Sequence, residues 1–270
     1  MTLRELAAAL LEVGIDEGEN EARMVFCELL GITPAELYSS ERSLTDTELL
    51  PIIERRRMRE PIQYILGKTY FYNETYTVAP EVLIPRQDTE ILVDYAVKHL
   101  KAGDKFIDLC TGSGCVGIST LANTKAEGAV LLDISLGAID IARRNAEQNG
   151  VISRTEFQRC DLLTDFPEGK YGAVLSNPPY VTEDEYTELQ KELYHEPRCA
   201  FVGGSDGLIF YRRIIDNLDK ILLPHGFAAL EIGALQAEAV VRLATERGFI
   251  SEVIKDFSGH DRVVVLRYPN

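Results

Sequence analysis

The segment Asn177-Pro178-Pro179-Tyr180 follows an apolar run with the composition of a buried strand. Proline lacks a backbone N–H and fixes φ near −65°, so the strand must end here. Each proline also keeps the residue before it extended, which presents the Asn177 amide and the Pro178 carbonyl as fixed acceptors. Such acceptors can bind both hydrogens of a planar amide or aromatic amine and aim its nitrogen at an electrophile, while Tyr180 stacks on the planar group. The alternative is that the prolines only terminate the strand.

A glycine-rich loop follows an earlier expected strand, "KFIDL". Gly112 and Gly114 let the backbone approach a ligand closely, and the N-terminus of the next helix offers unpaired N–H groups. The spacing Gly112-x-Gly114-x-x-Gly117 matches the fingerprint of dinucleotide-binding proteins. Asp133, about 20 residues further on, is suited to bind a pair of ribose hydroxyls. The loop therefore indicates either a dinucleotide or a nucleoside cofactor.

Asp108 favours one of these cofactors. It lies at the end of its strand, directly before the loop, where a carboxylate repels a pyrophosphate but suits a ligand with an ammonium and a sulfonium group. S-adenosylmethionine is such a ligand. Asp161, after the third strand, is placed to face an adenine edge, and Leu162 beside it can pack on the ring. Asp108, Asp133, Asp161 and Asn177 all follow strands, so a parallel sheet would gather them in one crevice.

The elements that must position these residues alternate between helix and strand from about residue 86 to residue 270. This pattern predicts a mostly parallel, Rossmann-like sheet covered on both faces. The chain ends differently, because two strand-like runs flank "SGHD" with no helix between them. We expect a terminal hairpin whose last strand is antiparallel to the rest. The predicted fold is thus an α/β sheet of the class I S-adenosylmethionine-dependent methyltransferase type.

The first part of the chain follows a different pattern. Residues 1–60 contain only helical periodicity, with capping boxes at Thr2-x-x-Glu5 and Thr45-x-x-Glu48, and they predict a small helical bundle for recognition or packing. Residues 61–85 alternate aromatic and β-branched residues with polar ones from Gln63 to Ile84, and predict a β-hairpin linker. Residues 86–270 form the predicted methyltransferase domain.

The composition excludes several classes of protein. A net charge of −15 argues against a broad phosphate-binding face, so no direct nucleic-acid substrate is expected. No apolar run is long enough to span a membrane. The five cysteines are scattered without a C-x-x-C pair, and the four histidines show no ligand spacing. We therefore expect a cytoplasmic protein with neither a disulfide framework nor a metal site.

Over nearly its whole length the chain resembles the HemK/PrmC family. The resemblance includes "PIQYILGKTYF", "VLIPRQDTE", "IDLCTGSGCVGIS", "VLSNPPYV", "EPRCAFVGGSDGL" and "LEIG". It implies transfer of a methyl group from S-adenosylmethionine to the side-chain amide of the glutamine in the Gly-Gly-Gln motif of class 1 peptide-chain release factors, with S-adenosylhomocysteine as the other product. It also implies that the helical bundle helps to bind the release factor.

The resemblance assigns roles to individual residues. Together with the arguments above, it predicts cofactor contacts from Cys110, Thr111, Gly112, Ser113, Gly114, Asp133, Asp161, Leu162 and Asn177. The predicted substrate-binding residues are Asn177, Pro178, Pro179 and Tyr180, of which Asn177, Pro178 and Tyr180 are the catalytic candidates.

The chain departs from the family pattern at Cys110, Gln87 and Leu162, and Gln87 stands where proline is common. Cys110 replaces a frequent glycine, from which we expect that its position does not need a positive φ. Leu162 replaces a frequent tryptophan that would stack on adenine. Adenine-N6 methyltransferases of DNA or RNA share the Asn-Pro-Pro-Tyr motif, so this activity remains an alternative. A non-catalytic or NAD-binding Rossmann module is the other alternative, disfavoured by the same motif and by the terminal hairpin.

Overall fold

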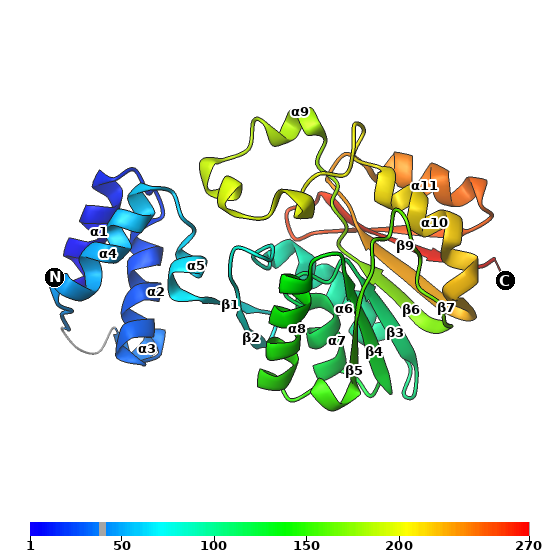
Figure 1. Ribbon diagram of the computed structural model, residues 1–270, viewed down its shortest axis with the longest axis horizontal. Helices are drawn as coiled ribbons and strands as arrows, with labels where there is room; N and C mark the ends of the chain where they lie inside the picture. The colour runs from blue at the N-terminus through cyan, green and yellow to red at the C-terminus, as the bar shows by residue number, and fades with distance from the viewer. Residues whose placement is uncertain (38–41, 270) are drawn as a thin grey trace. The chain divides into compact units, whose positions relative to one another are not determined.

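The structure is a computed structural model that describes residues 1–37 and 42–269. It divides into two compact units, each with its own hydrophobic core. The first unit comprises Met1–Lys68 and Gln190–His195, and the second comprises Thr69–Leu189 and Glu196–Asn270. Figure 1 follows the chain from blue to red through these two units.

The first unit is helical, as the periodicity predicts. Both predicted capping boxes form, at Thr2 and Thr45, and Gly31 ends the second helix in a left-handed conformation with φ 61°. Leu6, Leu10 and Phe26 are fully buried at its centre. Its helices are α1 (Leu3–Glu12), α2 (Gly18–Leu30), α3 (Pro34–Leu37), α4 (Asp46–Arg57) and α5 (Ile62–Leu66).

A distant part of the chain returns to this unit. The segment Gln190–His195 includes the short helix η3 (Lys191–His195). His195 Nε2 lies 2.9 Å from the Met58 carbonyl oxygen, and Glu192 Oε1 lies 3.6 Å from the buried Arg56. The last turn of α4 and the residue that follows it therefore hold this segment in the first unit.

The predicted hairpin is shorter than expected, because its first residues are helical. Pro61, with φ −54°, begins α5, and Gly67, with φ 73°, ends it. The strands are confined to β1 (Lys68–Phe71) and β2 (Glu74–Thr77). The alternation of polar and apolar residues therefore predicts strands correctly only on either side of the Tyr72-Asn73 turn.

The second unit is built on a seven-stranded sheet in the order β5-β4-β3-β6-β7-β9-β8. The strands from β5 to β7 are parallel, whereas β9 is antiparallel to both of its neighbours, as the sequence predicts. Its strands are β3 (Lys105–Leu109), β4 (Gly128–Asp133), β5 (Thr155–Arg159), β6 (Tyr171–Ser176), β7 (Leu222–Glu231), β8 (Ile250–Lys255) and β9 (Asp261–Arg267).

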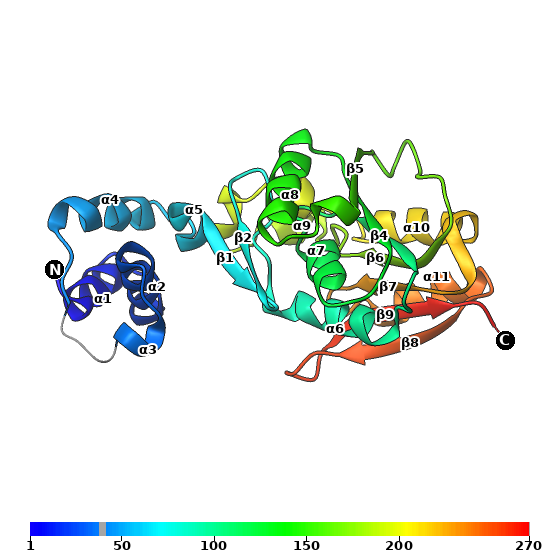
Figure 2. The same cartoon turned by 90° about the horizontal axis from the view of Figure 1, so that it is seen from below.

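Helices cover both faces of this sheet, and alternate residues of each strand supply two cores (Figures 1 and 2). Phe106 faces the core beneath α6, α7 and α8, while the next residue, Ile107, faces the core beneath α10 and α11. The helices are α6 (Glu90–His99), α7 (Cys115–Ala122), α8 (Leu136–Gln148), α9 (Glu183–Tyr186), α10 (Ile209–Ile221) and α11 (Ala237–Glu246), with short helices η1 (Gln87–Thr89), η2 (Ile152–Arg154) and η4 (Arg198–Ala200).

Candidate active site

A cavity of about 360 Å³ opens at the carboxyl ends of β3, β4 and β6, where an open α/β sheet binds its ligands. Its wall brings together most of the predicted site residues, although they come from four separate strand ends. Those on the wall are Cys110, Thr111, Gly112, Ser113, Asp133, Asp161, Leu162, Asn177 and Pro179. Gly114, Pro178 and Tyr180 are not part of this wall.

The loop after β3 uses left-handed backbone conformations at three positions. Gly112 and Gly114 have φ of 55° and 84°, as expected of glycines in a tight ligand-binding loop. Cys110 has φ 60°, so the expectation that this position does not need a positive φ is wrong. An added Cβ at Gly112 would meet nothing within 4 Å, whereas one at Gly114 would lie 2.6 Å from Ile118 Cδ1. Gly112 therefore leaves open space and Gly114 permits close packing.

Asp108 lies beneath this loop. Its Oδ2 accepts hydrogen bonds from Thr111 Oγ1 at 2.5 Å and from Gly117 N at 3.0 Å, which fix the loop on the start of α7. Burial raises the pKa of Asp108 to about 7, and the Asp133 carboxylate also acts to raise it. Asp108 is thus buried under the cavity rather than exposed on its wall, and its Oδ1 is buried without a hydrogen-bond partner in the described residues.

Asp133 is held on the wall with both oxygens oriented. Gly112 N donates to Oδ2 and Ser135 N donates to Oδ1, each at 2.9 Å. Burial raises the pKa of Asp133, against the opposing effect of these backbone hydrogen bonds. Each carboxylate oxygen still has a lone pair for a hydroxyl group, which is what a ribose diol needs. A cationic ligand would also relieve the proximity of the Asp108 and Asp133 carboxylates.

Asp161 and Leu162 occupy the next strand end. Asp161 Oδ1 accepts a hydrogen bond from Leu163 N at 3.0 Å, which closes a turn after β5. Leu162 is buried on the cavity wall, and Arg213 Nε donates to its carbonyl oxygen at 2.6 Å. The wall at this point therefore combines an apolar side chain, which can pack on the face of a purine, with a carboxylate, which can accept a hydrogen bond from its edge.

The Asn-Pro-Pro-Tyr segment is fastened from both sides. Ser176 Oγ donates to the Leu109 carbonyl at 2.7 Å, which ties the end of β6 to the end of β3. The Tyr180 carbonyl accepts a hydrogen bond from Gln236 Nε2 at 3.0 Å. Burial raises the pKa of the Tyr180 phenol to about 12. The loop from Gly203 to Leu208 packs behind this segment, and an added Cβ at Gly203 would lie 2.5 Å from the Pro179 carbonyl oxygen.

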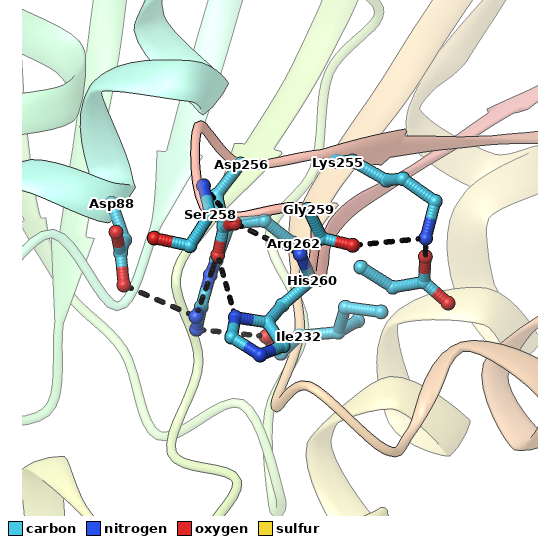
Figure 3. Close-up of polar contacts among 9 residues, drawn as sticks. Asp88, Ile232, Lys255, Asp256, Ser258, Gly259, His260 and Arg262 are labelled. Carbon is cyan, nitrogen blue, oxygen red and sulfur yellow. Dashed lines mark hydrogen bonds and ion pairs between the residues drawn. The ribbon is translucent and has the colours of Figure 1, made fainter.

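Sequence reasoning missed a group of polar residues around Asn177. Thr89 precedes α6 and accepts a hydrogen bond from Asn177 Nδ2 at 3.2 Å. Glu231 ends β7 and is buried. Arg262, on β9, binds Asp88 and Asp256 at 3.1 Å each and donates to the Ile232 carbonyl (Figure 3). Thr89 and Glu231 lie in the quoted "PRQDTE" and "LEIG", but only the folded chain brings these two motifs to Asn177.

Within residues 1–37 and 42–269, no helix is both long and apolar enough to cross a membrane. The same ranges contain no group of three or more His, Cys, Asp or Glu side chains arranged to hold a metal ion.

The sheet order, the antiparallel last strand and this cavity define a class I methyltransferase that uses S-adenosylmethionine. The same fold occurs in a ribosomal protein L11 methylase from Lactobacillus delbrueckii subsp. bulgaricus, with a TM-score of 0.53, 19% identity and coverage of 72% of this chain and 84% of the other. A methyltransferase from Pyrococcus furiosus is similar, with a TM-score of 0.54, 17% identity and coverage of 71% and 87%.

Sequence comparison narrows the class to a family. Residues 2–67 match the PrmC N-terminal domain, and residues 87–205 match the methyltransferase small domain. The chain is 40% identical to the release factor glutamine methyltransferase of Thermodesulfovibrio yellowstonii over 256 residues, which are 92% of this chain and 91% of the relative. It is 35% identical to that of Geobacter sulfurreducens over 261 residues, or 94% and 91%. The chain belongs to the release factor glutamine methyltransferase family.

Proposed function

We propose that this enzyme transfers the methyl group of S-adenosylmethionine to the side-chain amide nitrogen of the glutamine in the Gly-Gly-Gln motif of class 1 release factors. The observation that carries the proposal is the position of Asn177 on the wall of the same cavity as Gly112 and Asp133. A hydrogen-bonding amide therefore lies beside the region suited to the cofactor. Family membership supports the choice of substrate.

In this proposal the cofactor occupies the region between the glycine loop and Leu162. Asp133 accepts the ribose hydroxyls, and the backbone from Cys110 to Gly114 follows the rest of the ligand closely. S-adenosylmethionine supplies an electrophilic methyl group on a sulfonium. The buried acids Asp108 and Asp133 favour a cation over a neutral or anionic ligand at this site.

The protein's own contribution to the chemistry is orientation. An amide nitrogen is a poor nucleophile because its lone pair is delocalised. Asn177 Oδ1 and the Pro178 carbonyl accept its two hydrogens, and Tyr180 contacts its planar group. Fixed acceptors cost no reorganisation during the reaction, and the nitrogen needs no strong base because its proton becomes acidic only after methyl transfer.

The helical residues of the first unit serve, in the same proposal, to bind the release factor away from the reacting group. The family match of residues 2–67 supports this role. Binding energy from such remote contacts helps to hold the reacting glutamine in place.

Incubation with radiolabelled S-adenosylmethionine tests the proposal, with intact release factor, its Gln-to-Ala form and DNA or RNA offered in parallel. We expect label only in the intact release factor. Asn177→Ala should fold normally and lose about 10²–10³-fold in kcat, the usual loss for one preorganised polar contact. Label in nucleic acid, or equal label in the Gln-to-Ala release factor, would reject the proposed substrate.

A further inference from the structure

Glu231 is a buried carboxylate for which the proposed reaction has no use. It ends β7, and the parallel register that pairs Ser176 with Leu230 places Asn177 and Glu231 at the next step along their strands. Only 2% of Glu231 is exposed, and its Oε2 is buried without a hydrogen-bond partner in the described part of the chain. Burying a carboxylate is costly, so its position directly beside the Asn-Pro-Pro-Tyr segment calls for a compensating role.

Thr89 connects this carboxylate to Asn177. Its side chain is also buried, and its Oγ1 lies 3.2 Å from Asn177 Nδ2. The side chains of Thr89 and Asn177 also act to lower the pKa of Glu231, as donors beside a carboxylate do. A threonine hydroxyl has one hydrogen to donate, so when it donates to Glu231 it can only accept from Asn177.

This arrangement fixes which end of the Asn177 amide faces inward. A carboxamide carries two donors on nitrogen and only acceptors on oxygen. With nitrogen inward, one of its hydrogens meets Thr89 Oγ1, and the amide donors lie on the side of the Glu231 carboxylate. With oxygen inward, it would meet acceptors instead, at a cost of the order of a lost buried hydrogen bond. The inward nitrogen leaves Oδ1 for the cavity.

We propose that Glu231 and Thr89 are positioning residues that hold the Asn177 carboxamide with its oxygen toward the substrate, and that they do so when Glu231 is ionised. The inference rests on the proposed role of Asn177 Oδ1 as an acceptor for the substrate amide. Protonated Glu231 gains a donor, which can bind the Asn177 oxygen and remove the preference for one orientation.

The charges around Glu231 make its ionisation sensitive to pH near neutrality. Burial raises the pKa of Glu231 to about 7, Thr89 and Arg262 act to lower it, and Asp88 acts to raise it. Arg262 is held in place by Asp88 and Asp256, and Figure 3 draws the contacts of both carboxylates with its guanidinium as dashed lines. The fraction of molecules in which Asn177 Oδ1 faces the cavity should therefore increase as pH rises through about 7.

Other ionisable groups facing Glu231 come from several elements. Tyr180 follows β6, Tyr211 lies on α10 and donates to the Glu231 carbonyl at 2.8 Å, and Cys115 begins α7. Burial raises the pKa of Tyr180 and Cys115 to about 12, and that of Tyr211 well above its usual value, so these three stay neutral near pH 7. His260 reaches Asp256, at 3.8 Å, rather than Glu231, and requires a control variant.

The kinetic test uses the full chain and intact release factor. Thr89→Val keeps the shape of the side chain but removes the hydroxyl. We expect kcat to fall about 10-fold to 100-fold, as for a misplaced reacting group, with the Kd of S-adenosylmethionine little changed in calorimetry. Thr89→Ser should restore most of kcat. A Thr89→Val enzyme with normal kcat, or one that loses activity only through cofactor affinity, would overturn the proposal.

The pH profile tests the ionisation of Glu231. Wild-type kcat should rise with pH through about 7 and then level off. Glu231→Gln should lower the plateau and remove this rise, whereas His260→Gln should keep the wild-type profile. A rise that persists in Glu231→Gln, or disappears in His260→Gln, would assign the ionisation to another group and contradict the proposal.

A substrate-free measurement separates this inference from the proposed function. The side-chain amide signals of Asn177, assigned by their loss in Asn177→Ala, should shift in ¹⁵N–¹H spectra with a midpoint near pH 7 in wild type and not in Glu231→Gln. These spectra remain informative if release factor proves not to be the substrate, or if Thr89→Val fails to fold. Asn177 signals that do not change with pH in the wild type would overturn the inference by themselves.

Discussion

Cys110 adopts a left-handed backbone conformation directly after β3, at a position where the sequence indicated no such need. A side chain with a Cβ pays about 1–2 kcal/mol in this region, a cost that glycine avoids. Cys110→Gly should therefore be more stable than Cys110→Ala by about 1 kcal/mol in chemical unfolding, since both changes remove the sulfur. At Cys115, which begins α7 with an ordinary backbone, the order of Gly and Ala should be reversed. The same order at both positions would show that the φ of Cys110 carries no strain.

Asp108 and Asp133 should make the ratio of the affinities for S-adenosylmethionine and S-adenosylhomocysteine depend on pH. Burial raises the pKa of Asp108 to about 7, so this carboxyl ionises more fully as pH rises toward 8, and burial also raises the pKa of Asp133 beside it. A negative site favours the sulfonium of S-adenosylmethionine, which S-adenosylhomocysteine lacks. The ratio of their affinities should shift toward S-adenosylmethionine by roughly threefold to tenfold between pH 6 and pH 8, for an interaction on the order of 1 kcal/mol.

Calorimetry with both ligands at each pH measures this ratio, and Asp108→Asn should reduce its change. A ratio independent of pH in the wild type would mean that neither acid senses the sulfonium. The two ligands differ only in the methyl group and the fixed positive charge of the sulfonium, so each serves as the control for the other.

Individual residues also mark the limit of what sequence can reveal. Asp133, Asp161, Leu162 and Asn177 could be predicted at strand ends because parallel strands deliver their carboxyl ends to one edge of a sheet. The burial of Asp108 under the loop could not be predicted, because it depends on hydrogen bonds from Thr111 and Gly117, which lie three and nine positions later.

At the scale of elements, the loop from Gly203 to Leu208 shapes the Asn-Pro-Pro-Tyr segment from behind. Gly203 N donates to the Val181 carbonyl at 2.8 Å, and a Cβ at Gly203 would collide with the Pro179 carbonyl. Gly203→Ala should therefore shift the segment and lower kcat about 10-fold or more, because small displacements of a reacting group are costly. Steady-state methylation measures this loss. Gly128→Ala, whose Cβ would meet the Arg154 carbonyl oxygen at 3.1 Å at the start of β4, is the control.

An unchanged kcat in Gly203→Ala would show that the loop moves and the Asn-Pro-Pro-Tyr segment keeps its position.

Sequence patterns predicted the helices and strands well where caps and periodicity agreed, as at Thr2, Thr45 and the terminal hairpin. They failed at residues 62–66, where Pro61 and Gly67 delimit a helical turn inside an alternating pattern. Local turn chemistry outweighed the periodicity there.

At the scale of the whole molecule, the division into two units was visible as a change from helical periodicity to alternating helices and strands. The position of Gln190–His195 was not visible in the sequence. This segment belongs to the first unit because it contacts residues more than 130 positions earlier, including Glu192 with Arg59 and His195 with Met58. Charged and polar pairs of this kind leave no periodic signal in the sequence. The boundary after Lys68 likewise falls later than the residue 60 that helical periodicity suggested.

Removal of residues 1–68 tests the division of labour between the units. Every residue on the cavity wall lies in the second unit, so the shortened chain should bind S-adenosylmethionine with a Kd within about threefold of wild type. Its kcat/KM on intact release factor should fall by about 100-fold or more, since remote contacts supply binding energy for the reacting group. A short peptide containing Gly-Gly-Gln cannot use such contacts and should be methylated equally by both forms. Loss of activity on the peptide as well would instead mean that the first unit supports the active site, and full activity on release factor would mean that it does not contribute to recognition.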